Sequence, residues 1–238
     1  MTAERSDAMN FKNFLEQVKS GDYEALIFDL DGTLIDSMSM WTEVDKKFLE
    51  QRGLKLTDEY TRTVKCSTLM QSALFTINYY GLDETPEHVI ECWESMVKEK
   101  YRTEVKVKDG AQIFLEKLSK LDVYMVCATA LSRENAVNAL IGNDIMKFFD
   151  RVITLDELEQ KVNKGNPLIY ETACREHGIG DFSRCVVFED ILIALEGASK
   201  SGFKLCAVYD ELSSSEWDKM CDISDYCIRN WSEIKKIC

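Results

Sequence analysis

The stretch EALIFDLDGTLIDS, residues 24–37, places two aspartates at the end of a short apolar run and follows them with Gly-Thr. The run over residues 25–30 is typical of a strand buried in a parallel sheet. Because side chains alternate along a strand, Asp29 and Asp31 would lie on one side of it. Two carboxylates this close repel each other, so we expect them either to share a proton or to hold a hard cation such as Mg²⁺.

Four further apolar runs have the same character. The predicted strands are residues 25–30, 123–128, 151–154, 185–188 and 205–208. The helices between the last four strands cover about 132–142, 165–177 and 191–201. Strands that alternate with helices in this way predict an α/β fold with a doubly wound parallel sheet.

The segment 37–105 breaks the alternation because it contains no convincing strand. Gly53 and Gly81 stand where helices would end, and Pro86 stands where one would begin. The predicted helices of this segment are residues 38–53, 58–66, 68–80 and 86–101.

We interpret residues 37–105 as an inserted α-helical cap domain over the carboxyl ends of the strands, where open α/β sheets bind ligands. Residues 21–36 and 106–238 would form the core domain. Residues 1–20 would be a helical extension, because the apolar side chains between residues 9 and 19 recur at helical spacing.

Three other predicted strands also end in residues that suit phosphate chemistry. Glu189 and Asp190 form a second acidic pair, Thr129 offers a hydroxyl near backbone N–H groups, and Lys164 offers an ammonium. Each is weak evidence alone, since Thr129 could simply cap a helix and Lys164 could be solvated. Because parallel strands end at one edge, we expect the set to converge there. A nucleophilic carboxylate, a cation, a lysine and amide donors are the parts that phosphoryl transfer needs.

In this order, the motifs resemble those of the haloacid dehalogenase (HAD) superfamily, in its β-phosphoglucomutase-like branch with a helical cap. FDLDGTLIDS is similar to the first family motif, and CATA, around Thr129, is similar to the second. NKGNPLIY resembles the third, with Lys164 and Pro167 retained, and VVFEDILIALEGASKSG resembles the fourth. The resemblance extends from Glu24 to about Ile228 and implies a Rossmann-like core.

The resemblance also implies a role for each site residue. Asp29 would be the nucleophile that forms an aspartyl-phosphate, and Asp31 would be the acid/base. Mg²⁺ would be held by the side chains of Asp29 and Asp190, the backbone carbonyl of Asp31, and Glu189 directly or through water. The phosphoryl oxygens would be held by Thr129, the Ala130 amide and Lys164. The chain would then be a Mg²⁺-dependent phosphatase, a phosphoric monoester hydrolase that acts on a small phosphorylated metabolite.

Departures from the family pattern bear on the alternatives. Trp41 stands where the sugar-phosphate mutases carry a cap histidine, and VKCSTLMQ, residues 64–71, lacks their arginine. Hydrolysis is therefore favoured over a β-phosphoglucomutase-like isomerisation, and a metal-independent dehalogenase would leave the second acidic pair unexplained. Ile191, Ala194 and Leu168 replace residues usual in the third and fourth motifs. They keep open a HAD-like binding protein with a weakened site.

Three further residues have two interpretations each. Trp41 could cover the substrate or pack within the cap, and the two alternatives are about even. Lys65 could meet a substrate anion, although solvation is favoured for a single lysine on a cap helix. Arg133 could reach phosphate, although solvent exposure is favoured.

The formal net charge of −13 gives the chain no general attraction for nucleic acid or for an anionic membrane surface. No apolar run approaches the length of a membrane span, and the first residues lack a signal-peptide pattern. The nine cysteines include no CxxC pair, which suits reduced thiols. We therefore expect a cytoplasmic protein, and a monomer, with a small-molecule partner.

Overall fold

A six-stranded sheet forms the centre of the computed structural model, which describes residues 3–64, 69–160 and 162–234. The strand order is β5-β4-β1-β6-β7-β8, and each neighbouring pair is parallel. The strands are β1 (Ala25–Phe28), β4 (Tyr124–Thr129), β5 (Arg151–Thr154), β6 (Cys185–Glu189), β7 (Lys204–Val208) and β8 (Tyr226–Ile228). The predicted parallel α/β fold is confirmed.

Strand β1 lies at the point where the winding of the sheet reverses. The chain adds β4 and β5 on one side of β1 and β6 to β8 on the other. Phe28, the last residue of β1, is in register with Cys127 of β4 and Phe188 of β6. Such a switch point leaves a crevice at the carboxyl ends of the strands, so whatever follows Phe28 stands at its mouth.

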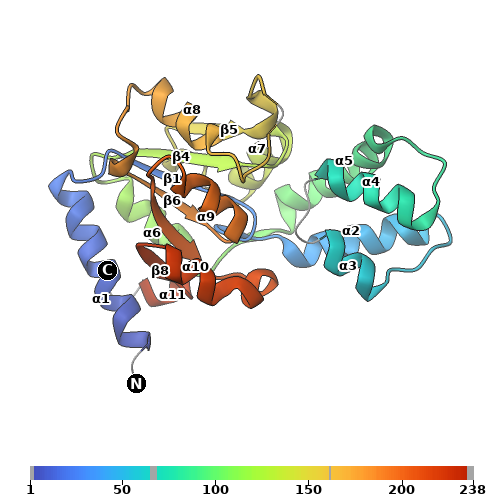
Figure 1. Ribbon diagram of the computed structural model, residues 1–238, viewed down its shortest axis with the longest axis horizontal. Helices are drawn as coiled ribbons and strands as arrows, with labels where there is room; N and C mark the ends of the chain where they lie inside the picture. Colours follow the sequence, from blue (N-terminus) through green and yellow to red (C-terminus); the bar gives the residue numbers. More distant parts are fainter. Residues whose placement is uncertain (1–2, 65–68, 161, 235–238) are drawn as a thin grey trace.

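Alternate side chains of the strands enter two separate apolar cores. Leu26 and Phe28 belong to one core, and Ala25 and Ile27 belong to the other. The second core is closed by α8 (Leu168–Glu176), α9 (Leu192–Ser199) and α10 (Trp217–Ile223). The first is closed by α1 (Ala3–Ser20), α6 (Ala111–Leu118), α7 (Arg133–Gly142) and α11 (Trp231–Ile234). Helices therefore cover both faces of the sheet, as a fully buried parallel sheet requires (Figure 1).

The predicted N-terminal helix is present as α1, which is longer than the predicted residues 9–19. Its Phe14 is fully buried and its ring meets those of Phe188 and Tyr226 edge-on. The Tyr226 hydroxyl also donates to Oε1 of Gln17 at 2.6 Å. These contacts join α1 to β8, the edge strand on that side.

The inserted segment is helical, as predicted, and its helices lie together to one side of the sheet (Figure 1). They are α2 (Met38–Glu50), α3 (Asp58–Val64), α4 (Leu69–Tyr80) and α5 (Pro86–Thr103). The chain enters and leaves them through β2 (Ile35–Asp36) and β3 (Lys106–Val107), which pair antiparallel. Gly53 has a φ of +69° just after α2 ends, which suits a residue without a Cβ. The division into core and cap domains at residues 37 and 105 stays a prediction.

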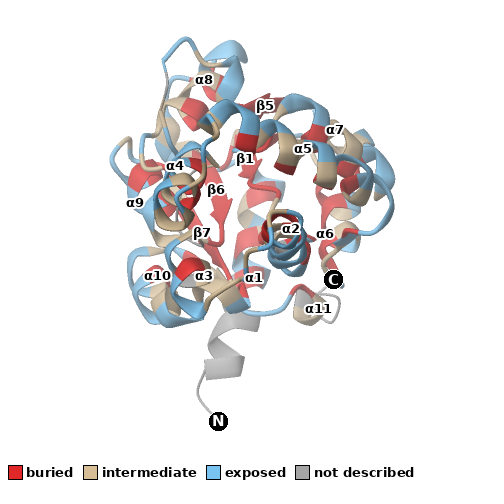
Figure 2. Cartoon of the chain, turned by 90° about the vertical axis from the view of Figure 1, so that its right-hand side faces the viewer, coloured by how far each residue is buried: buried red, intermediate tan, exposed pale blue. Residues whose placement is uncertain are grey.

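Burial follows the layers of the fold. Figure 2 shows buried strands behind helices whose outer faces are exposed. Buried cysteines occupy this interior as free thiols: Cys127, Cys174, Cys185 and Cys206. Among the helices of the described ranges, none has both the length and the apolar character needed to cross a bilayer.

Several elements were not anticipated from the sequence. Strand β8 is only three residues long, and β2 and β3 have two residues each. Helix α8 begins at Leu168 rather than at residue 165, because the Asn163 and Asn166 side chains accept backbone N–H groups and form turns there. Whether such short segments form strands depends on the segments beside them in space, which the local sequence does not identify.

Candidate active site

Three buried carboxylates converge at the switch point of the sheet. Asp29 directly follows β1, Glu189 ends β6 and Asp190 is the next residue. Because Phe28 pairs with Phe188, Asp29 and Glu189 are neighbours across the two strands, and the Asp29 amide donates to the Phe188 carbonyl. One oxygen from each of the three carboxylates lies within 4.8 Å of the others. The predicted convergence of two separate acidic segments is present in the structure.

Lys164 inserts its ammonium among these carboxylates from the loop before α8. Its Nζ contacts Oδ1 of Asp29 and lies 2.5 Å from Oε1 of Glu189. The Tyr170 hydroxyl, on α8, donates to the same Glu189 oxygen at 2.9 Å. Lys164 is only 6% exposed, so it is a buried ion-pair partner rather than a solvated surface residue.

The charges of this cluster do not balance. Three carboxylates face one ammonium, which leaves an excess of negative charge in a buried place. Burial and the neighbouring Asp29 raise the pKa of Glu189 to about 7, and they raise the pKa of Asp190 as well. Burial alone would lower the pKa of Lys164, but the carboxylates of Asp29 and Glu189 raise it above its usual range. Buried charge of one sign is costly unless a counter-ion neutralises it.

The donor set fits a hard divalent cation. All three groups offer oxygen, which Mg²⁺ prefers, and two positive charges would offset the excess. Asp190 is held in place because the Thr33 hydroxyl donates to its Oδ1 at 2.9 Å. Gly32 allows this approach, since a Cβ at that position would overlap the Asp190 carboxylate. The Gly-Thr pair of the opening motif thus positions the second acidic segment.

Two hydrogen bonds connect Asp31 to the inserted helices. The Tyr101 hydroxyl, on α5, donates to Oδ2 of Asp31 at 2.7 Å, and Nε1 of Trp41, on α2, donates to the Tyr101 hydroxyl at 3.0 Å. Burial raises the pKa of Asp31 to about 6, although the nearby Ser37 and Tyr101 hydroxyls lower it. The indole nitrogen of Trp41 is therefore engaged within the protein.

Two of the remaining predicted residues lie at the carboxyl end of the strand next to β1. Thr129 ends β4, the strand beside β1, and its buried hydroxyl accepts the Leu131 amide at 3.2 Å. Ala130 follows it and is exposed. Lys65 lies outside the described residues.

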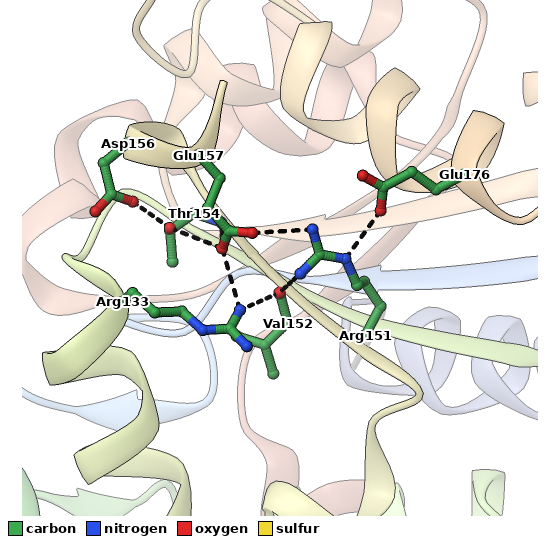
Figure 3. A network of polar contacts seen from close by, with 7 residues as sticks. All are labelled: Arg133, Arg151, Val152, Thr154, Asp156, Glu157 and Glu176. Carbon is green, nitrogen blue, oxygen red and sulfur yellow. Dashed lines mark hydrogen bonds and ion pairs between the residues drawn. The ribbon is translucent and has the colours of Figure 1, made fainter. Parts of the chain in front are cut away.

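Arg133 binds groups outside the cluster of Asp29, Glu189 and Asp190. Its Nη1 binds Oε1 of Glu157 at 3.1 Å and also the Val152 carbonyl, which Arg151 binds as well. Figure 3 shows Glu157 between the two guanidinium groups, beside edge strand β5. The favoured interpretation, solvent exposure, agrees with a side chain that is 48% exposed, although Arg133 also forms an ion pair with Glu157.

Sequence reasoning missed Tyr101 and assigned no role to Thr33. Tyr101 lies four and eight residues after two buried residues of α5, Val97 and Trp93, so its spacing indicates only a core position. Its polar partner is seventy residues away in the chain. Thr33 lies two residues after Asp31 in the opening motif, and this nearness in the chain was the one signal that it belongs to the site.

Comparisons with known proteins agree with this geometry. The family model for haloacid dehalogenase-like hydrolases matches residues 26–208. The phosphorylated carbohydrates phosphatase of Thermotoga maritima is 23% identical over 76% of this chain and 82% of its own length. The validoxylamine A 7'-phosphate phosphatase of Streptomyces hygroscopicus subsp. limoneus is 26% identical over 76% of this chain and 83% of its own.

The fold is also shared with a solved structure. A HAD hydrolase of family IA, variant 3, from Entamoeba histolytica superposes with a TM-score of 0.77 at 24% identity. The match covers 90% of this chain and 97% of that one. The family match spans both acidic segments and the lysine between them. The chain therefore belongs to the haloacid dehalogenase-like hydrolase family, and it is a hydrolase with a helical insertion beside a parallel-sheet core.

Proposed function

We propose that this hydrolase is a Mg²⁺-dependent phosphatase that cleaves a small phosphorylated metabolite and forms an aspartyl-phosphate on Asp29. The observation that carries the proposal is the buried cluster of Asp29, Glu189 and Asp190 around the Lys164 ammonium. Lys164 lies against an oxygen of Asp29, and a carboxylate oxygen in this place can attack phosphorus as a nucleophile.

The reaction would proceed by two displacements, with Asp29 as the nucleophile and Asp31 as the acid and then the base. An oxygen of Asp29 attacks phosphorus while the bond to the leaving oxygen breaks, and Asp31 gives its proton to that oxygen. Water then attacks the aspartyl-phosphate, Asp31 takes a proton from the water, and the bond between Asp29 and phosphorus breaks. Because burial raises the pKa of Asp31 to about 6, both of its protonation states are accessible near neutral pH.

The other residues of the site hold the reacting group. The side chains of Asp29 and Asp190, the main-chain carbonyl of Asp31, and Glu189 directly or through water would hold Mg²⁺, which offsets charge on phosphoryl oxygens when bound. Thr129, the Ala130 amide and Lys164 would bind those oxygens. Lys164 already lies against the nucleophile, so it would meet the phosphoryl group there.

Sugar and polyol phosphates are the first substrates to test. The two phosphatase relatives carry phosphorylated carbohydrate and validoxylamine A 7'-phosphate in their names. Trp41 stands at the position of the mutase histidine, and its indole N–H donates to the Tyr101 hydroxyl. Hydrolysis is therefore proposed rather than phosphate transfer within a sugar.

The proposal is tested by measuring inorganic phosphate released from a panel of phosphate esters, with and without Mg²⁺. We expect turnover with Mg²⁺ and loss of at least about a thousandfold in kcat for Asp29→Asn, since an amide cannot attack phosphorus. Asp22→Asn is the matched control, because Asp22 is an exposed carboxyl before the amino end of β1 and should leave kcat unchanged.

Three outcomes would contradict the proposal. An Asp29→Asn enzyme with wild-type kcat would remove Asp29 as the nucleophile. A sugar 1-phosphate converted to the 6-phosphate, instead of to free sugar and inorganic phosphate, would establish the isomerase. A protein that binds Mg²⁺ but turns over no ester on the panel would support the binding-protein alternative.

A further inference from the structure

A chain of two hydrogen bonds runs from the inserted helices to the proposed acid/base. Nε1 of Trp41 donates to the Tyr101 hydroxyl at 3.0 Å, and that hydroxyl donates to Oδ2 of Asp31 at 2.7 Å. Trp41 is on α2 and Tyr101 is on α5, so two different helices meet at this carboxylate. The two rings are 6.5 Å apart and meet edge-on, and Tyr101 is fully buried.

The direction of this chain follows from the chemistry of the groups. An indole N–H can only donate, so the Tyr101 oxygen must accept from Trp41. The single hydroxyl proton of Tyr101 is then directed to Oδ2 of Asp31, which must accept it. A proton on Oδ2 would compete with this bond, whereas Oδ1 makes no hydrogen bond of ordinary geometry within the described residues, and the other hydroxyl near this carboxyl group is that of Ser37. The two oxygens of one carboxyl group are thus made unequal.

We propose that Tyr101 is a positioning residue that holds Oδ2 of Asp31, so that Oδ1 is the oxygen that transfers the proton. This inference rests on the proposed phosphatase function. Trp41 acts one step further out, by holding Tyr101 rather than by covering the substrate. The buried and unpartnered Oδ1 is the free end of the carboxyl group, and a leaving oxygen or a water would be its partner.

One proton moves through Oδ1 in each displacement, outward in the first and inward in the second. Oδ1 gives its proton to the leaving oxygen as that oxygen separates from phosphorus, and the carboxylate remains bound to Tyr101 through Oδ2. Oδ1 then takes one proton from the attacking water, which restores the starting state. Tyr101 keeps its own proton throughout, so removing its hydroxyl disturbs orientation rather than the supply of protons.

The test compares two esters in Tyr101→Phe, which keeps the ring and removes the hydroxyl. An alkyl phosphate needs its leaving oxygen protonated, whereas p-nitrophenyl phosphate has a good leaving group and needs little help. We expect kcat/KM for the alkyl ester, which reports the first displacement, to fall about tenfold to a hundredfold, a part of what general acid catalysis supplies. The fall in kcat/KM for p-nitrophenyl phosphate should be about threefold or less, and hydrolysis of the aspartyl-phosphate, which is common to both esters, does not enter this comparison.

Two further variants keep the proposal falsifiable. Trp41→Phe removes the indole donor and should shift the same ratio of kcat/KM values in the same direction, by a smaller factor. Tyr60→Phe is the matched control, because Tyr60 is another buried tyrosine of the inserted helices whose hydroxyl bonds to Thr76 and not to Asp31. It should lower thermal stability without changing the ratio between the two esters.

The outcomes separate this inference from the function on which it rests. Equal losses of kcat/KM on both esters in Tyr101→Phe, or no loss, would overturn the positioning role while the phosphatase function stood. A ratio that changed equally in Tyr60→Phe would also overturn it, because general loosening of the helices would then explain the effect. Failure of the wild-type protein to hydrolyse either ester would overturn both.

Discussion

At the scale of single residues, Gly32 links the two acidic segments. It has a φ of +78°, and a Cβ there would overlap the carboxylate of Asp190. The next residue, Thr33, donates to the other oxygen of the same carboxylate. The turn after β1 therefore fits closely around a side chain that is 157 residues further along the chain.

Gly32→Ala and Gly21→Ala form a matched pair. Both glycines have a φ of +78°, but a Cβ on Gly21 would meet no atom within 4 Å. The backbone strain of each alanine should lower the free energy of unfolding by about 1 kcal/mol. Gly32→Ala should lose more stability and also bind Mg²⁺ at least about tenfold more weakly, because Asp190 must move. Urea unfolding and Mg²⁺ titration would check this, and equal effects of the two changes would contradict it.

At the scale of elements, α2 carries a half-buried acid, Asp45, for which the described residues provide no ion-pair partner. Asp45 accepts a hydrogen bond from the Tyr60 hydroxyl of α3 at 3.3 Å, and Tyr60 also bonds to Thr76 of α4. Burial raises the pKa of Asp45 to about 7, although the Tyr60 hydroxyl lowers it in part. The folded state therefore favours the protonated form, and these three helices pack best when Asp45 is neutral.

This raised pKa gives stability a definite dependence on pH. The contribution of neutral Asp45 is fully present below the ordinary Asp pKa of 3.8 and is lost as the pH rises from there through about 7. Asp45→Asn should therefore raise the unfolding free energy at pH 8, by on the order of 2–4 kcal/mol, and change it little at pH 3.5. Asp83→Asn changes an exposed acid of the same segment and is the control. Thermal unfolding at several pH values measures both, and a gain that does not vary with pH would contradict the mechanism.

At the scale of the whole molecule, the proposed Mg²⁺ site joins segments that are far apart in the chain. Asp29 stands at β1 and Asp190 after β6, so a cation bound by both would link the two sides of the switch point. The same carboxylates repel each other when no cation offsets them, since Lys164 supplies a single positive charge. Folding and cation binding are therefore expected to be linked.

Mg²⁺ should stabilise the protein against thermal unfolding, by about 2.7 kcal/mol at a concentration one hundred times the dissociation constant. Asp190→Asn should remove this gain and raise the stability measured without Mg²⁺, because one buried negative charge is gone. Differential scanning calorimetry with EDTA or with Mg²⁺ measures both effects, and NaCl at matched ionic strength controls for screening. The same Mg²⁺ gain in Asp190→Asn as in the wild type would rule out this residue as a ligand.

The sequence by itself determined the parallel sheet except for its edge strand β8, and it determined the meeting of the acidic segments. Parallel strands end at one edge, so Asp29 and Asp190 could be placed together from periodicity alone, and the family match then identified the hydrolase. Strand ends are local features with a fixed direction, which is why this prediction succeeded. The roles of Thr129 and Ala130 in binding phosphate stay predictions.

Only the tertiary structure decided the contacts between side chains of separate elements. Tyr101 reads as one more apolar position of α5, and its bond to Asp31 depends on how the inserted helices pack beside the sheet. Arg133 could have turned to phosphate, but Glu157 and the Val152 carbonyl hold it beside the edge strand. Periodicity determines which face a residue occupies, whereas its partner on that face depends on elements that the chain brings together only when it folds.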